Sequence, residues 1–161
     1  MSAYTAALVQ EEEFRPMRPH TDRDHPNAIK LKQAHDAFKA GNLDALFDLM
    51  RPDVKWHMPG KNALSGTYVG REEIMRNFAL LQQNVDAYWA HALDYFGSDD
   101  HVALVAQVRA RRGNKTLDVQ ECMLWHVDGD GKLAECWHMA CDHLAWDEFF
   151  DGSPGTESGK P

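Results

Sequence analysis

The chain has 161 residues, of which 43% are hydrophobic, and its formal net charge is −8 at pH 7. A chain of this length forms one domain that can bury a core. The negative charge argues against nucleic acid and against an anionic membrane surface as partners, because both are bound by basic patches.

The two ends of the chain differ from its middle in composition. Residues 1–24 mix charges and prolines without any sustained period, and residues 151–161 are rich in glycine and serine. We expect a flexible N-terminal arm over 1–24 and a flexible tail over 151–161. One folded domain is therefore predicted over 25–150.

The first half of this domain shows mainly helical periodicity. Apolar residues recur at helical spacing over 29–38 and again over 43–50, which Pro52 terminates. A strand is expected over 53–58, and helical spacing returns over 70–81. These segments predict three helices with one strand among them.

The second half changes to strand periodicity. Turn segments rich in glycine, asparagine and aspartate separate four candidate strands, at 86–96, 101–111, 115–127 and 133–141. A short helix is expected over 144–150. This order predicts an α+β fold: a curved antiparallel sheet of about five strands, with three N-terminal helices packed on its concave face and a short C-terminal helix.

Several segments in this pattern resemble one known family. In chain order they are 40–46, 53–60, 64–71, 129–132 and the acidic, aromatic C-terminal part from Glu135 to Phe150. Over about residues 26–150 the sequence is similar to SnoaL-like proteins of the nuclear-transport-factor-2-like (ketosteroid isomerase-like) superfamily. The resemblance implies a cone-shaped α+β barrel, a deep apolar pocket inside the curved sheet, and homodimers that form through the outer face of the sheet.

The resemblance leaves the chemistry open. Proteins that look like this include steroid isomerases, polyketide cyclases, epoxide hydrolases, dehydratases and non-catalytic binding proteins, and a shared fold does not choose among them. Counting from nearby glycines and prolines aligns the tyrosine of the steroid isomerases with Ala34, beside His35. Their base aligns with Met58, or with His57 if the register slips by one, and their aspartic acid aligns with Met123. None of these positions holds the isomerase residue, so classical steroid isomerisation is not expected.

His57 and Glu121 are the predicted catalytic pair. His57 stands among apolar residues at the end of a strand, where an imidazole can serve as a base near neutral pH. Glu121 lies within an apolar strand, where a carboxyl group must be paired or protonated and can act as an acid. Tyr68, in a glycine-flanked loop, is a second candidate acid. The sequence does not decide whether His57 or Met58 faces the pocket.

A further set of side chains is predicted to line the pocket and contact a substrate. Each is aromatic or sulfur-containing, apart from one histidine: Trp56, Met58, Trp89, Met123, Trp125, Trp137 and His138. Aromatic side chains of this kind serve equally well as core packing. No metal site is predicted, because strand alternation disperses the histidine, cysteine and aspartate side chains over 138–143 onto two faces. No cofactor motif is present in the sequence.

Three functions remain open. The first is a cofactor-independent enzyme that transfers protons on a small hydrophobic or aromatic molecule, of the isomerase, cyclase or dehydratase type, with His57 as base and Glu121 or Tyr68 as acid. The second is a non-catalytic hydrophobic-ligand-binding protein or a dimeric accessory protein. The third is a water-activating hydrolase, which needs an arginine or a second carboxylate at the floor of the pocket.

The three cysteines are odd in number and lie in apolar segments, which favours buried thiols over a disulfide framework. Neither a signal peptide nor a membrane span is predicted, because the apolar run at 6–9 is short and meets three glutamates. We therefore expect a soluble cytoplasmic protein, and the family resemblance implies that it forms a homodimer.

Overall fold

The computed structural model describes residues 23–151. The expected arm and tail lie outside this range, apart from residues 23, 24 and 151. The elements follow in the order α2 Pro26–Lys39, α3 Asp44–Phe47, β1 Met50–Met58, β2 Gly66–Val69, α4 Gly70–Gln83, β3 Ala87–Gly97, β4 His101–Arg112, β5 Lys115–Val127, β6 Leu133–Ala140 and α5 His143–Phe150.

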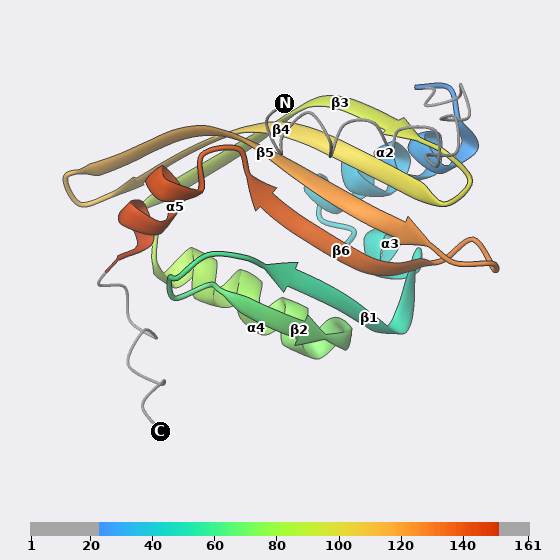
Figure 1. The fold of residues 1–161 in the computed structure, drawn as a ribbon, viewed down its shortest axis with the longest axis horizontal. Helices are drawn as coiled ribbons and strands as arrows, with labels where there is room; N and C mark the ends of the chain where they lie inside the picture. The colour runs from blue at the N-terminus through green and yellow to red at the C-terminus, as the bar shows by residue number, and fades with distance from the viewer. Residues whose placement is uncertain (1–22, 152–161) are drawn as a thin grey trace, which may run out of the picture.

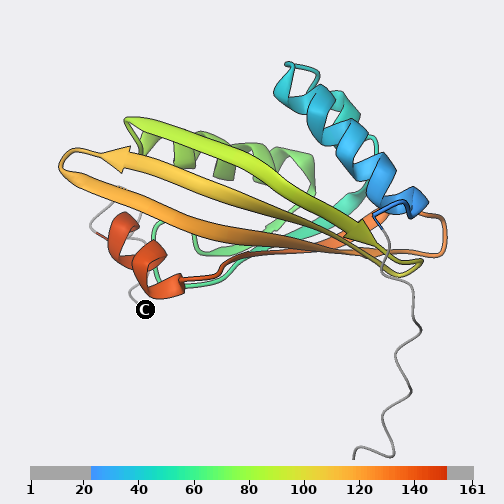
Figure 2. The same ribbon diagram turned by 90° about the horizontal axis from the view of Figure 1, so that it is seen from above.

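The strands form one six-stranded sheet in the order β2-β1-β6-β5-β4-β3 (Figure 1). All neighbours are antiparallel except β1 and β6, which are parallel. The sheet is curved (Figure 2), and its two edge strands, β2 and β3, lie at opposite sides of it (Figure 1). The predicted α+β class is confirmed, although the sheet stays open where the resemblance implied a barrel.

Two predicted boundaries differ from the structure. The second helix ends at Phe47 rather than near residue 50, because the chain enters β1 at Met50, which pairs with Leu133. The register between β1 and β6 shifts between Met50 and Lys55. Pro52, which has no N–H to donate to a ladder, lies within this irregularity.

Strand β2 was not expected from the sequence. The segment Gly66–Val69 was interpreted as loop, but its four residues pair with Lys55–Met58. A strand of this length carries too few residues to show a period of two. The alternation of buried and exposed side chains is visible only in its longer partner, β1, whose pairing defines β2.

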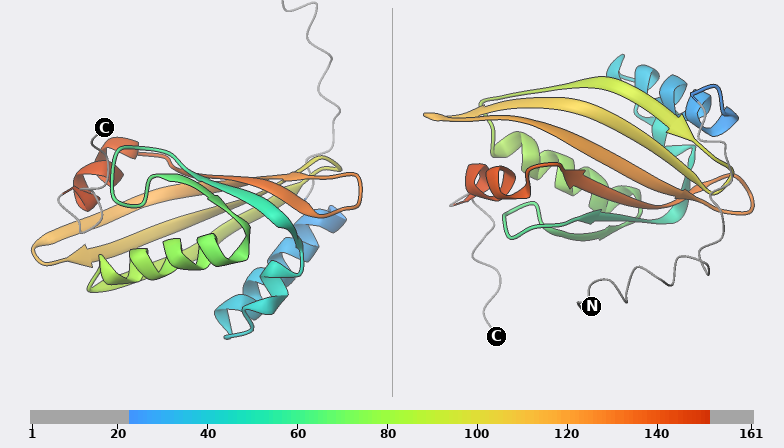
Figure 3. Two further views of the ribbon diagram at one scale, coloured as in Figure 1. Left: turned by 90° about the horizontal axis from the view of Figure 1, so that it is seen from below. Right: turned by 45° about the horizontal axis from the view of Figure 1, so that its top comes forward.

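The helices lie mainly on one side of the sheet. Figure 2 shows α2, α3 and α4 along the same face, as predicted, and Figures 1 and 3 show α5 at the end of the sheet away from α2. α5 packs chiefly against β5. Within residues 23–151, no helix is both long enough and apolar enough to cross a membrane.

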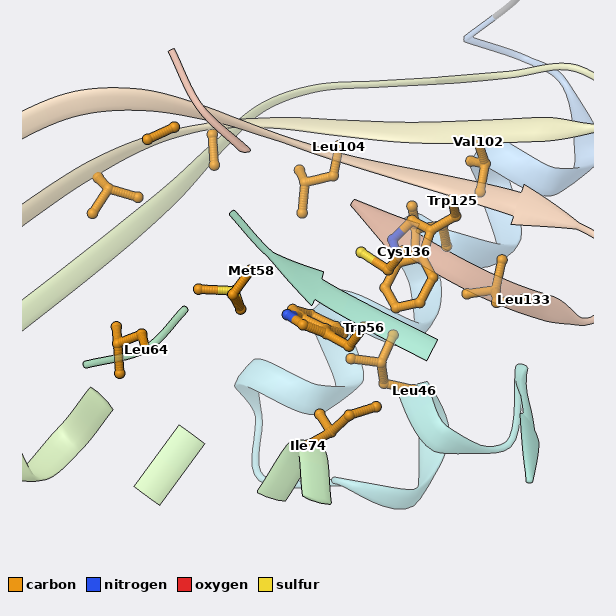
Figure 4. Packing of buried hydrophobic residues seen from close by; sticks show 14 of the residues in the cluster. Leu46, Trp56, Met58, Leu64, Ile74, Val102, Leu104, Trp125, Leu133 and Cys136 are labelled. Carbon is orange, nitrogen blue, oxygen red and sulfur yellow. The ribbon is translucent and has the colours of Figure 1, made fainter. Parts of the chain in front are cut away.

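Strand alternation divides the side chains between the two faces. Trp56 and Met58 of β1 are buried beneath the helices with Trp125 and Cys136, as the close view of the core shows (Figure 4). Trp56 pairs with Cys136 across the parallel β1–β6 ladder, and residues paired in a ladder share a face. His57, next to Trp56, therefore points to the opposite, convex face.

Candidate functional site

A cavity of about 490 Å³ lies between the concave face of the sheet and the helices. This volume falls within the range of about 300–1,000 Å³ that is usual for small-molecule sites. Apolar and aromatic side chains supply most of its wall, and five further side chains in it are polar or ionisable: His35, Gln82, Asp86, Glu121 and His138. The lining residues are His35, Phe38, Leu46, Trp56, Phe78, Leu81, Gln82, Val85, Asp86, Ala87, Tyr88, Ala90, Glu121, Met123 and His138.

The cavity has a mouth on the protein surface. Gln82 at the end of α4, and Asp86 and Ala90 near the start of β3, line it and are exposed. The sequence suggested an enclosed pocket, whereas this arrangement lets a ligand enter without a movement of the sheet. The deeper part of the wall contains Glu121 and Trp56, which are both buried.

Glu121 and His138 form a hydrogen-bonded pair in this wall. β5 and β6 run antiparallel with Met123 opposite His138, and Glu121 lies two residues along β5 on the same face. The distance from Glu121 Oε2 to His138 Nε2 is 2.6 Å. A contact this short between a carboxyl oxygen and a ring nitrogen is a charge-assisted hydrogen bond.

The second ring nitrogen of His138 fixes the protonation of the pair. His138 Nδ1 lies 2.9 Å from the sulfur of Met58. A thioether sulfur can only accept a hydrogen bond, so we assign a proton to Nδ1. One further proton lies in the hydrogen bond between Nε2 and Oε2, and it can be bonded either to the nitrogen or to the oxygen. The pair therefore holds a proton that can move between the two side chains.

A second histidine reaches the cavity from α2. His35 lines the wall, and its Nδ1 is hydrogen-bonded to the hydroxyl of Tyr95 on β3. Burial lowers the pKa of His35, and the nearby charge of Lys39 lowers it further. Burial raises the pKa of Tyr95 to about 12, helped by the charge of Asp36. Both groups are therefore neutral at pH 7.

Two more polar groups belong to the cavity wall. Burial raises the pKa of Tyr88 well above its ordinary value, and the nearby charge of Glu121 adds to this shift. Tyr88 is thus a neutral phenol at neutral pH. The indole N–H of Trp56 is buried and has no hydrogen-bond partner within the described residues. Buried donors are normally paired, so this one marks a place where a ligand or water can accept.

Four of the residues predicted from the sequence lie together in the cavity wall: Trp56, Glu121, Met123 and His138. Met58 does not line the cavity, but its sulfur contacts His138 from the same face. The remaining predicted residues lie elsewhere: His57, Tyr68, Trp89, Trp125 and Trp137.

The predicted pair of His57 and Glu121 is not formed. His57 Nε2 lies 2.6 Å from Glu135 Oε1, and its Nδ1 lies 2.9 Å from the hydroxyl of Thr67. Its ring stacks on Trp137 at a centroid distance of 5.6 Å. All of these contacts are on the convex face, because the apolar residues of β1 on either side of His57 turn toward the core.

The other predicted residues have structural surroundings of their own. The hydroxyl of Tyr68 donates to the carbonyl of Leu64 at 2.9 Å. Trp125 is buried and packs edge-on against Trp56 at 5.2 Å between ring centroids. Trp89 is 60% exposed on the convex face. None of the three lines the cavity.

Three residues of the site neighbourhood were missed by the sequence analysis as functional candidates: His35, Tyr88 and Tyr95. His35 follows Ala34, the position that the resemblance aligns with the tyrosine of the steroid isomerases. This position in the sequence could have identified His35 as a candidate. Tyr88 and Tyr95 share the concave face of β3 only because the register of β3 and β4 shifts between Ala92 and Asp94. Strict alternation would have placed them on opposite faces.

The groups required by the hydrolase hypothesis are not at the cavity floor. No arginine is among the residues that line the cavity. Arg109 instead forms a 3.2 Å ion pair with Asp118, in which both side chains are exposed. The second carboxylate of the lining, Asp86, is exposed and accepts a hydrogen bond from the backbone of Gly113 at 2.7 Å. In the stretch 23–151, no group of three or more histidine, cysteine, aspartate or glutamate side chains could hold a metal ion.

Comparison with known proteins agrees with this architecture. A family model described as a SnoaL-like domain matches residues 31–136, which is more than half of the chain. The chain therefore belongs to the SnoaL-like family.

Its relatives share most of its length. Uncharacterized proteins of Mycobacterium tuberculosis and Mycobacterium bovis are 28% identical to it over 122 residues, which cover 74% of this chain and 92% of theirs. The structure of Bal32a, from a soil-derived mobile gene cassette, superposes with a TM-score of 0.69 at 27% identity, over 80% of this chain and 99% of that one. IdmH from Streptomyces antibioticus, for which a polyketide cyclase activity has been proposed, superposes with a TM-score of 0.56 at 21% identity, over 75% and 97% of the two chains.

Proposed function

We propose that this protein catalyses cofactor-independent proton transfer on a small hydrophobic or aromatic molecule, as an isomerase, cyclase or dehydratase does. The observation that carries the proposal is the buried pair of Glu121 and His138 in the wall of a mainly apolar cavity. A general acid or base must lie within hydrogen-bonding reach of the substrate and must hold a proton that can move. Glu121 lines the cavity and is hydrogen-bonded to His138, which supports this role, and we propose it as the base in place of His57.

The proposed step uses the two oxygens of Glu121 differently. Oε2 is held by His138, while Oε1 makes no hydrogen bond within the described residues. With the shared proton on His138, Oε1 takes a proton from a carbon of the bound substrate. The imidazolium of His138 stabilises the pair during this step. The carboxyl group then returns the proton to a second substrate atom, so that no proton is lost and no cofactor is consumed.

Deuterium exchange into an enolisable aromatic ketone tests this step. 2-Tetralone is a suitable compound, because its α-protons exchange with D₂O and the loss of their NMR signal is easily followed. We expect the protein to accelerate this exchange, and Glu121→Gln to reduce the acceleration by roughly 100-fold or more. His57→Gln is the matched control, and we expect it to leave the rate unchanged. Equal rates for the parent and Glu121→Gln would contradict the proposal.

The binding-protein hypothesis is favoured by a different observation, the unpartnered N–H of Trp56 in the cavity wall. A non-catalytic binder would use this donor to hold a ligand without any proton transfer. It predicts ligand-induced thermal stabilisation that survives Glu121→Gln and an exchange rate no higher than that of buffer. The same 2-tetralone experiment therefore separates the two functions.

We propose a second copy of this chain as the partner on the convex face. Trp89 is 60% exposed and Leu93 is 50% exposed, and both line a hollow of about 720 Å³ on that face. Large apolar side chains gathered on a surface typically mark an interface. Sedimentation of the parent as a dimer, and of Trp89→Glu with Leu93→Glu as a monomer, is the expected result. A monomeric parent at micromolar concentration would exclude this partner.

We also propose that the protein works in the cytoplasm. The three cysteines are free, and Cys141 is exposed. An exposed thiol stays reduced most readily in a reducing compartment. Cell fractionation of the untagged protein tests this location, and recovery outside the cytoplasmic fraction would exclude it.

A further inference from the structure

The wall of the cavity contains polar groups that the proposed proton transfer does not use. His35 Nε2, the Tyr88 hydroxyl and Trp56 Nε1 make no hydrogen bond within the described residues, although all three side chains line the cavity. Buried polar groups are normally paired, and Trp56 Nε1 is buried without a partner within the described residues. His35 Nε2 and the Tyr88 hydroxyl open onto the same cavity, so a bound molecule can supply partners to all three.

His35 is the group among them whose orientation is fixed by a neighbour. Its Nδ1 is bonded to the hydroxyl of Tyr95, which does not line the cavity. The Nδ1 edge of the ring therefore points away from the cavity. The opposite edge, which includes Nε2, faces the cavity.

The tautomer of His35 follows from the same contact. The hydroxyl of Tyr95 has His35 as its only side-chain partner within the described residues, and it keeps its proton because burial raises the pKa of Tyr95 to about 12. An imidazole nitrogen accepts a hydrogen bond better than a phenol oxygen does, so Tyr95 donates and Nδ1 accepts. The ring proton of neutral His35 then lies on Nε2.

The interior of the cavity offers a ligand no unpaired charge. Glu121 is already paired with His138, burial lowers the pKa of His35, and burial raises the pKa of Tyr88. The one other ionisable lining residue, Asp86, is exposed. A charged ligand would lose its hydration here without gaining an opposite charge.

We infer that His35 is a specificity-determining residue: its Nε2–H donates to a carbonyl oxygen of an uncharged aromatic ligand, and Tyr95 is the positioning residue that fixes this donor. The inference rests on the proposed function for the identity of the site. It adds the functional group that the substrate must carry. A donor held in place before the ligand arrives also stabilises the negative charge that a carbonyl oxygen gains when Glu121 removes a neighbouring proton.

Binding of two matched aromatic compounds tests the inference without any chemistry. Benzophenone and diphenylmethane have the same two rings, joined by a carbonyl group or by CH₂, and benzophenone has no enolisable proton. We expect the protein to bind benzophenone about ten-fold more tightly, as one hydrogen bond provides, with the quenching of tryptophan fluorescence as the readout. The anion 4-benzoylbenzoate should bind more weakly than benzophenone.

Variants assign this preference to one residue. His35→Phe should remove it, and His57→Gln, which changes a histidine on the convex face outside the cavity, should retain it. Because His35→Phe enlarges a buried ring, Tyr95→Phe provides a second variant that leaves His35 in place. It should reduce the preference and change the ¹⁵N NMR signals of His35, which we expect to show a neutral Nε2–H tautomer at pH 7 in the parent.

The outcomes separate this inference from the proposed function. Equal binding of the two compounds, binding of neither, a preference that survives His35→Phe, or an Nδ1–H tautomer would each overturn the role of His35. Glu121→Gln should keep the preference for benzophenone while losing deuterium exchange. A preference without any exchange in the parent would refute the proton transfer and leave the role of His35 standing.

Discussion

The same sheet carries two histidine–glutamate pairs of equal length on its opposite faces. His57 and Glu135 lie 2.6 Å apart on the convex face, with side chains 26% and 32% exposed. His138 and Glu121 also lie 2.6 Å apart, but on the concave face, with side chains 10% and 2% exposed. Contact distance alone does not distinguish the two pairs; burial does.

Burial gives these pairs different consequences. Water screens the convex pair and can replace either partner, so such a pair typically contributes about 0–1 kcal/mol to stability. On the concave face water is largely excluded, and each partner of the pair depends on the other. A buried pair is therefore a poor device for stability, but it can hold a proton where a substrate binds. This contrast favours the concave pair as the functional one.

The largest expected effect comes from breaking the concave pair. His138→Leu leaves the carboxyl group of Glu121 buried without its partner, and we expect a loss of about 3–5 kcal/mol in the free energy of unfolding. Urea unfolding followed by fluorescence measures it. A loss below about 1 kcal/mol would show that water reaches Glu121 and that the two pairs are equivalent.

Replacing both members of the concave pair sharpens the comparison. In Glu121→Met with His138→Leu no buried polar group is left unpaired, so most of the stability lost in His138→Leu should return, to within about 1–2 kcal/mol of the parent. Deuterium exchange into 2-tetralone should stay at the level of buffer. A double variant that is as unstable as His138→Leu would mean that packing at residue 138, rather than the unpaired carboxyl group, explains the loss.

The sequence predicted most of the fold because its signals were local. Hydrophobic periods of two for strands and 3.6 for helices, together with the turn residues between the segments, identified the bounds of four of the six strands closely. They identified β1 in part. The missed strand, β2, has only four residues and gains its definition from β1. The second helix was predicted too long because its apolar residues continue into the first residue of β1.

The site was harder to predict because it depends on register. Glu121 and His138 were both recognised as candidates, but their pairing requires Met123 to lie opposite His138. A slip of one residue would move either side chain to the other face. The sequence left open whether His57 or Met58 faces the pocket for the same reason, although Trp56 and Met58 alternate with polar neighbours. The contact of His35 with Tyr95 joins residues 60 positions apart and has no local signal.

A third effect on the concave face is the dependence of stability on pH, which we expect His35 to influence. The pKa of His35 is lowered by burial from its ordinary value of 6.5, so below this pH the unfolded chain binds a proton that the folded protein excludes. Stability should therefore fall as the pH drops below about 6.5, until the folded protein also binds the proton. His35→Asn should make this fall smaller when unfolding is measured between pH 7 and pH 5. An unchanged pH dependence would show that His35 titrates normally.

The smallest effect is expected on the convex face. His57→Leu removes the partner of Glu135, but water can solvate the carboxyl group that remains, so the free energy of unfolding should change by about 0–1 kcal/mol. The effect should shrink further at high salt, because exposed charges are screened. Urea unfolding at low and high salt, run beside His138→Leu, makes the comparison direct. A loss for His57→Leu as large as that for His138→Leu would mean that the stacking of His57 on Trp137, and not solvent exposure, governs the convex pair.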